Sequence, residues 1–90
     1  PAGPAAPVAE PLAILFPPDG AEVELSSNRL SVRARGGTAP YTWLLDGRPV
    51  VIGSPAPVAD LPVRPGYGQL SVIDAAGRTS RAAVRLRGVN

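Results

Sequence analysis

The stretch YTWLLDGRPV, residues 41–50, decides the fold and contains the only tryptophan of the 90-residue chain. Alternate positions of its first half carry Tyr, Trp and Leu, so in an extended segment these three side chains share one face. The Asp-Gly pair that follows fits a two-residue hairpin turn, because both central residues of such a turn need a positive φ. We therefore expect a strand over 41–45 and a returning strand over 48–51, which its proline restricts to the edge of a sheet.

Alternation of apolar and polar residues recurs on both sides of this stretch. Residues 29–35 read RLSVRAR, with an apolar side chain at every second position, which is typical of a strand with one solvated face. The 10 glycines and 12 prolines suit short strands joined by tight turns. The segments that we expect to form strands are 12–16, 21–25, 29–35, 41–45, 48–51, 58–61, 67–74 and 78–87. The sequence therefore predicts an all-β fold, a small immunoglobulin-like β-sandwich of about seven antiparallel strands.

The core of such a sandwich needs a bulky side chain between its sheets, and Trp43 lies where an immunoglobulin-like domain places its buried tryptophan. The chain has no cysteine, so no disulfide can link the two sheets and the indole contributes more of the packing. We interpret Trp43 as a core residue in preference to a ligand platform, and we expect Phe16 to face inward as well. The residues assigned to the structural core are Trp43, Tyr41, Leu45, Leu70, Val72 and Val84.

The first residues differ in composition from the rest of the chain. Residues 1–11 read PAGPAAPVAEP, in which prolines and small residues replace the strand pattern, as is typical of an extended linker. We therefore divide the chain into a linker, residues 1–11, and an immunoglobulin-like module, residues 12–90. The chain begins with proline and shows neither a signal peptide nor an apolar run of about 18 residues, so we interpret it as part of a longer protein.

The residue types that usually carry catalysis are scarce. The chain has no histidine and no cysteine, and all nine basic residues are arginine, so it offers neither the usual general base nor an activated nucleophile. Glu22 and Glu24 share the solvated face of an expected strand, and most of the aspartates adjoin turns, which explains them without bound calcium. A net charge of +2 does not indicate a nucleic-acid partner. We therefore expect no catalytic residue, no cofactor and no metal site.

The arginines are spaced so that several share a face. Two lie on the outer face of the strand expected over 29–35 and three on that of the strand over 78–87, and they would form a basic stripe if these strands were neighbours. The simpler interpretation is a solvated face that keeps an edge strand from pairing with other chains. One tyrosine, in the strand over 67–74, is also expected to be free to remain exposed. The residues assigned as possible partner contacts are Arg33, Arg35, Arg81, Arg85, Arg87 and Tyr67.

Four segments occur in an order that resembles a known family: FPPDGAEVEL at 16–25, the arginine-rich strand that ends in Gly36-Gly37, PYTWLLDGRP at 40–49 and PGYGQLSVIDAAGR at 65–78. The most specific parts are the pattern W-x-x-D-G, from Trp43 to Gly47, and the pattern L-x-V-x-D-x-x-G-R, from Leu70 to Arg78. Over residues 12–87 the chain resembles the C-terminal domain of bifunctional penicillin-binding proteins of the 1C type.

The resemblance implies an accessory module that follows the transpeptidase domain of a membrane-anchored peptidoglycan synthase facing the periplasm. The catalytic motifs of that family include lysine, which this chain lacks, so none of its catalytic residues can be placed here. The implied function is non-catalytic: docking onto the upstream transpeptidase domain, or onto another periplasmic protein, during cell-wall synthesis. Two alternatives remain open, a module that binds peptidoglycan or another glycan, and a generic adhesion or spacer domain.

Overall fold

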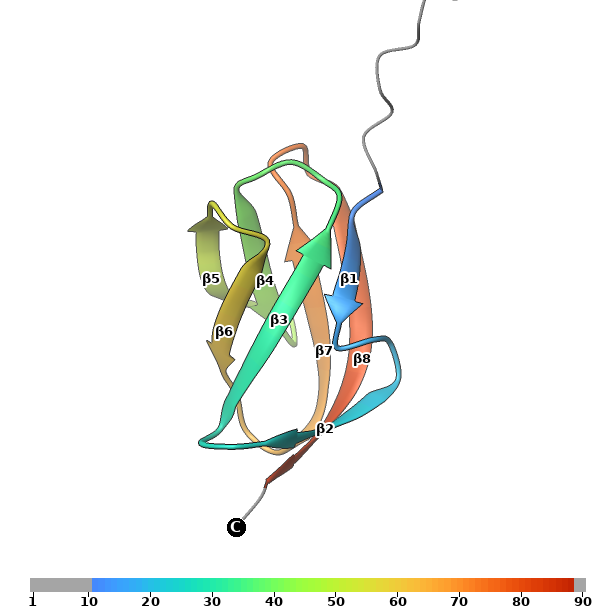
Figure 1. The fold of residues 1–90 in the computed structure, drawn as a ribbon, viewed down its shortest axis with the longest axis vertical. Helices are drawn as coiled ribbons and strands as arrows, with labels where there is room; N and C mark the ends of the chain where they lie inside the picture. The colour runs from blue at the N-terminus through green and yellow to red at the C-terminus, as the bar shows by residue number, and fades with distance from the viewer. Residues whose placement is uncertain (1–10, 89–90) are drawn as a thin grey trace, which may run out of the picture.

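The structure, a computed structural model, describes residues 11–88, which form eight strands in two facing sheets (Figure 1). None of these residues is helical, so the described segment contains no helix that could cross a membrane. The predicted linker, residues 1–11, lies outside the described residues apart from Pro11. The strands are β1 Ala13–Phe16, β2 Ala21–Leu25, β3 Arg29–Arg35, β4 Tyr41–Leu45, β5 Arg48–Ser54, β6 Val58–Pro62, β7 Gly66–Ile73 and β8 Thr79–Gly88.

The two sheets differ in width. The order β1-β3-β6 gives a three-stranded sheet, which lies in front in Figure 1, and the order β2-β8-β7-β4-β5 gives a five-stranded sheet behind it. The expected all-β sandwich is thus confirmed, and β5 lies at a sheet edge as its proline requires.

One strand pair departs from the expected antiparallel arrangement. After β1 the chain leaves the three-stranded sheet through the turn at 17–20, and β2 then runs parallel to β8, in register from Ala21 opposite Val84 to Leu25 opposite Gly88. A hydrogen bond fixes the connection between the two sheets to β8: Asp19 Oδ1 accepts it from the backbone N–H of Ala83 at 2.7 Å. β2 therefore forms no antiparallel hairpin with β1, because it joins the other sheet and lies beside β8.

The hairpin at the centre of the sequence has the predicted turn. Asp46 and Gly47 adopt φ angles of 52° and 81°, the positive values that a two-residue turn of this kind needs. The backbone N–H of Asp46 donates to the carbonyl of Gln69 at 2.8 Å, and the Asp46 carboxylate accepts from the backbone N–H of Gln69 at 2.9 Å. The turn is therefore fixed to β7 as well as to its own two strands.

The core is built around Trp43, whose side chain is fully buried. Trp43 lies opposite Val72 on β7, and Leu70, Val72 and Val84 of the predicted core are buried with it. Tyr41 is buried too, and its hydroxyl donates a hydrogen bond of 3.0 Å to the carbonyl of Gly36. The last residue of the predicted core set, Leu45, is partly buried and packs against the others. The indole thus occupies the space between the sheets.

Phe16 contradicts the sequence expectation. Its side chain is 44% exposed on the outside of the three-stranded sheet, although Leu12 and Ile14, four and two positions earlier, pack inward. The pairing of β1 with β3 shifts between Ile14 and Phe16, as in a β-bulge, which reverses the alternation of faces. Pro17 then takes the inward position and is fully buried. The expectation that Phe16 faces the core is therefore wrong.

Candidate functional site

The six residues assigned as possible partner contacts lie on two separate surfaces. Arg33 and Arg35 are exposed on β3, outside the three-stranded sheet, whereas Arg81, Arg85 and Arg87 are exposed on β8, outside the five-stranded sheet. The outer faces of two packed sheets point in opposite directions, so these five arginines do not form one continuous basic stripe. Tyr67 lies on β7, next to β8, and belongs with the second group.

Tyr67 and two of these arginines form one ordered cluster. Tyr67 is 79% exposed and lies directly opposite Arg85, whose guanidinium carbon is 5.2 Å from the centre of the tyrosine ring. On the other side Arg85 is paired in register with Glu22, and its Nε lies 3.5 Å from Glu22 Oε2. Arg87 Nη1 lies 3.4 Å from the other carboxylate oxygen of Glu22. We call the surface formed by Glu22, Tyr67, Arg81, Arg85 and Arg87 the Tyr67 face.

The contacts on the Tyr67 face orient its side chains more than they stabilise the fold. Exposed ion pairs such as those of Glu22 contribute about 0.2–1 kcal/mol each, and an exposed cation–π contact contributes about 0.5–1 kcal/mol. Arg85 is nevertheless held from both sides, by a carboxylate and by an aromatic ring. The face therefore presents an exposed aromatic ring beside a positioned guanidinium, with part of the positive charge balanced by Glu22.

Asp74 is the one buried charged residue in the described part of the chain. Its carboxylate accepts hydrogen bonds from the backbone N–H groups of Arg78 at 2.8 Å, Thr38 at 3.0 Å and Ala76 at 3.0 Å, and Arg78 Nε lies 3.9 Å away. Burial alone would raise the pKa of Asp74, but these three N–H donors and the Arg78 charge together lower the pKa below its ordinary value.

The hydrogen bonds of Asp74 give it a structural role. They join the turn between β7 and β8 to the loop before β4, where the N–H of Ala75 also donates to the carbonyl of Thr38 at 2.8 Å. From the sequence, Asp74 was expected at the end of the strand over 67–74, beside a turn, and its burial was not predicted. The signal that could have predicted this burial is the spacing, because Asp74 directly follows β7 and continues the alternation of the buried Leu70 and Val72.

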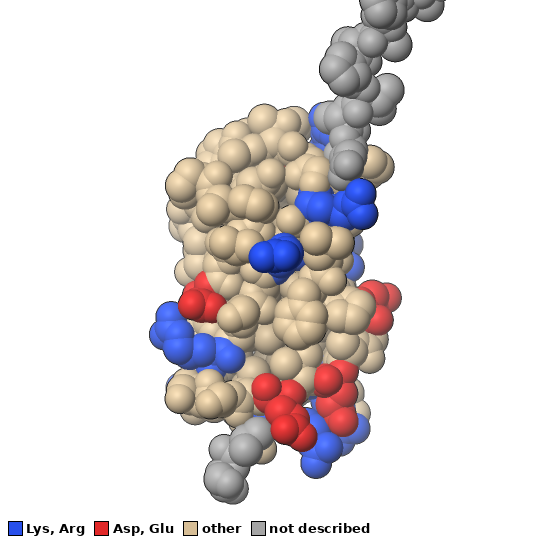
Figure 2. All heavy atoms as spheres, viewed as in Figure 1, with Lys and Arg blue, Asp and Glu red and all other residues tan. Residues whose placement is uncertain are grey.

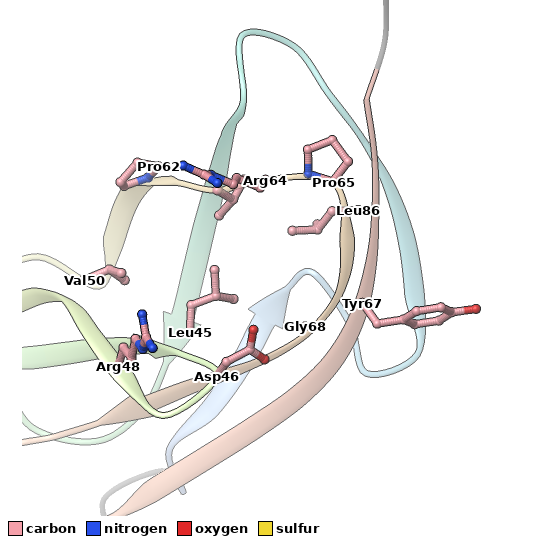
Figure 3. Close-up of a pocket in the computed structure, with 11 residues that line it drawn as sticks. Leu45, Asp46, Arg48, Val50, Pro62, Arg64, Pro65, Tyr67, Gly68 and Leu86 are labelled. Carbon is pink, nitrogen blue, oxygen red and sulfur yellow. The ribbon is translucent and has the colours of Figure 1, made fainter.

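Among the hollows of the described surface are two that the sequence did not predict. One, of about 570 Å³, lies between the β4–β5 turn and the connection from β6 to β7 (Figure 3). The other, of about 610 Å³, lies on the three-stranded sheet, where Phe16, Arg33 and Val58 stand side by side on neighbouring strands. Figure 2 shows that face, with a group of basic atoms near its middle among uncharged atoms and most other charged atoms toward the rim. Within residues 11–88 no group of three or more acidic, histidine or cysteine side chains could hold a metal ion.

The fold has a solved counterpart at low sequence identity. The chain superimposes with a TM-score of 0.68 on a structure described as fibronectin(III)-like modules of CbhA from Clostridium thermocellum, at 16% identity and over 88% of this chain and 99% of that one. At this identity the likeness establishes the fold and no function. Comparison with curated proteins gave no match.

The sequence profile of one family matches nearly the whole chain. This is the Penicillin-Binding Protein C-terminus Family, and the match extends over residues 2–86. It includes both motif segments on which the resemblance was based, Trp43 to Gly47 and Leu70 to Arg78. The resemblance drawn from those segments is confirmed, and the chain belongs to the penicillin-binding protein C-terminus family.

Proposed function

We propose that the chain is a non-catalytic accessory module of a peptidoglycan synthase in the bacterial cell envelope, and that it binds a protein through the Tyr67 face. The partner is either the transpeptidase domain of the same synthase or another periplasmic protein. Membership of the penicillin-binding protein C-terminus family supports the proposal that the chain is part of a peptidoglycan synthase. The observation that carries the binding role is the 79% exposure of Tyr67 beside a guanidinium that is already held in place.

The composition of the chain supports the non-catalytic part of the proposal. It has no histidine, cysteine or lysine, which removes most of the side chains that act as bases or nucleophiles near neutral pH. Asp74, the carboxylate with a lowered pKa, is already occupied by backbone donors and is shielded from solvent. A group in that state anchors loops and has no access to a substrate.

The residue types of the Tyr67 face support binding to a protein. Tyrosine and arginine are enriched at protein interfaces and among the residues that contribute most to binding energy. Because Glu22 and the ring of Tyr67 already restrict Arg85, less side-chain entropy is lost when a partner covers it. We therefore expect Tyr67 and Arg85 to contribute most of the contact energy, with Arg81 and Arg87 at the rim.

A photo-crosslinking experiment tests the proposal in the full-length protein that carries this chain. A photoreactive phenylalanine analogue replaces Tyr67, and in a matched control it replaces Phe16, which is exposed on the opposite sheet. We expect a crosslink from position 67, to another protein or to an upstream part of the same polypeptide, and a yield at least about tenfold lower from position 16. Adding the Arg85→Glu substitution to the position 67 variant should reduce the crosslink.

Three outcomes would contradict the proposal. Equal crosslinking from positions 67 and 16 would show that the Tyr67 face has no special role. Crosslinking only to peptidoglycan, together with retention of the purified chain on peptidoglycan that Tyr67→Ala abolishes, would favour the glycan-binding alternative. No crosslink from position 67, combined with unchanged cell-wall synthesis after deletion of the module, would favour a spacer.

A further inference from the structure

The hollow at the end of the sandwich is lined from two sides. Figure 3 shows Leu45, Asp46 and Arg48 coming from the β4–β5 turn, and Arg64 with its neighbouring prolines coming from the β6–β7 connection opposite. Tyr67 also belongs to the lining, but its ring points away from the hollow. The hollow and the Tyr67 face are therefore neighbouring but separate surfaces, and a ligand bound in the hollow would be additional to the partner of the Tyr67 face.

The floor of the hollow is aliphatic. Val63 and Leu86 are core residues that are almost fully buried, and Leu45 and Val50 are partly buried and pack against the core. With the ring of Tyr67 turned away, no aromatic face is directed into the hollow (Figure 3). Sugar rings usually bind against exposed aromatic faces, whereas aliphatic floors accept aliphatic or aromatic side chains. The floor therefore favours an apolar side chain over a glycan.

The rim of the hollow is basic. Arg48 and Arg64 are both exposed, and within residues 11–88 the side chain of neither has an ion-pair or hydrogen-bond partner, in contrast to Arg78, Arg85 and Arg87. The one acidic side chain of the lining, Asp46, accepts the backbone N–H of Gln69 through Oδ1. Two guanidinium groups against one carboxylate leave the lining with a net charge of +1, and guanidinium groups bind carboxylates in a planar, two-bond geometry.

The walls of the hollow are fixed before any ligand binds. Pro62 and Pro65 restrict the backbone on both sides of Arg64, and the N–H of Val63 donates to the carbonyl of Asn28 at 2.9 Å. Across the hollow the Asp46 turn is tied to Gln69 through both its backbone N–H and its carboxylate. A volume of about 570 Å³ is within the range of ligand sites that bury several groups at once.

We propose that this hollow binds an acidic and apolar peptide segment of a partner protein. One apolar side chain of the peptide lies on the floor formed by Leu45, Val50, Val63 and Leu86, and carboxylates on either side of it pair with Arg48 and Arg64. The aliphatic floor selects an apolar side chain of the peptide, and the two unpaired guanidinium groups at the rim select its carboxylates.

The test is an NMR titration of the ¹⁵N-labelled 90-residue chain with three synthetic heptapeptides, acetylated and amidated. In the first peptide glutamate alternates with leucine; in the second lysine replaces glutamate; in the third glycine replaces leucine. We expect saturable shifts of the amides of Val63, Gly66 and Gly68 with the first peptide, with a Kd of about 1 mM or tighter. The lysine and glycine peptides should bind at least about tenfold more weakly, and added salt should weaken the first peptide.

Substitutions then test whether the rim arginines are responsible. The double variant Arg48→Glu with Arg64→Glu should raise the Kd of the glutamate–leucine peptide at least about tenfold. Arg33→Glu, the matched control, changes an exposed arginine that borders the other hollow and should leave the Kd unchanged. A one-dimensional spectrum of each variant establishes that it is folded, and Arg48→Gln with Arg64→Gln serves if charge reversal unfolds the chain.

Four results would overturn the proposal: no saturable shift with the glutamate–leucine peptide; equal binding of the lysine or glycine peptide; shifts confined to residues around Phe16 and Val58; or binding that survives loss of both rim charges. None of these results bears on the crosslink from position 67, so the two proposals can fail separately.

Discussion

Replacing Trp43 by phenylalanine and by alanine separates two contributions of the buried indole. The side chain is fully buried, and within residues 11–88 its Nε1–H has no hydrogen-bond acceptor. Burying a tryptophan removes about 150–250 Å² from water, which at about 25 cal/mol per Å² corresponds to roughly 4–6 kcal/mol. The unpartnered N–H offsets part of this, since a buried donor without an acceptor costs about 1–3 kcal/mol.

The two substitutions should therefore differ widely in their effect on the free energy of unfolding. Trp43→Ala should lower it by about 3–5 kcal/mol, a large share of the roughly 5–13 kcal/mol expected for a chain of 90 residues. Trp43→Phe removes two carbons, worth about 1.6 kcal/mol, but it also removes the unpartnered N–H. Its unfolding free energy should stay within about 1.5 kcal/mol of the unsubstituted chain.

Urea unfolding followed by far-ultraviolet circular dichroism measures both values, because that signal does not depend on the indole. Tyr67→Phe is the matched control, since it changes an exposed aromatic ring and should shift the free energy by less than about 0.5 kcal/mol. A loss of more than about 3 kcal/mol for Trp43→Phe would refute the reasoning, because the N–H would then contribute to stability.

Three further predictions concern other parts of the fold. Because its pKa is lowered in the folded chain, Asp74 stabilises the fold above the ordinary value of 3.8, and this stabilisation is lost as the pH falls below that value toward the lower pKa of the folded chain. Urea midpoints at pH 7 and pH 3 should therefore differ less in Asp74→Asn than in the unsubstituted chain. Gly37→Ala should lower the melting temperature more than Gly47→Ala. Both glycines have a positive φ, but only at Gly37 would the added Cβ lie 2.9 Å from Asp74 Oδ2 and from Leu12 Cδ1. Equal melting temperatures of the two variants would contradict this. Tyr67→Ala should lower the unfolding free energy by at most about 1 kcal/mol, and it should abolish binding of the protein that crosslinks to position 67. A large loss of stability would show that the ring is structural.

The strands could be predicted from sequence because their pattern is local. Period-two alternation is regular in β3 and β8, whose buried positions follow it, and in the second half of β7, where Leu70 and Val72 are buried. The Asp46-Gly47 turn could be predicted as well, since few other residue pairs adopt two successive positive φ angles. Both signals depend only on neighbouring residues.

The positions that depend on contacts between distant segments could not be predicted in this way. The bulge that turns Phe16 outward arises from its pairing with β3, and the burial of Asp74 depends on a loop that lies 36 residues earlier, at Thr38. The hollow between the β4–β5 turn and Arg64 exists only because the sandwich brings them together. The arginines are grouped according to the sheet that each strand joins. The alternation of residues along a strand does not specify that sheet.

The parallel pairing of β2 with β8 has a mechanical consequence. The described segment begins at one end of its long axis and ends near the other (Figure 1). Tension applied between Pro11 and Gly88 would pull β2 and β8 in opposite directions along their length, so their hydrogen bonds, in register over five residue pairs, would be loaded together in shear and not opened one after another. We therefore expect a module with this geometry to resist stretching more strongly than a stability of about 5–13 kcal/mol alone would suggest.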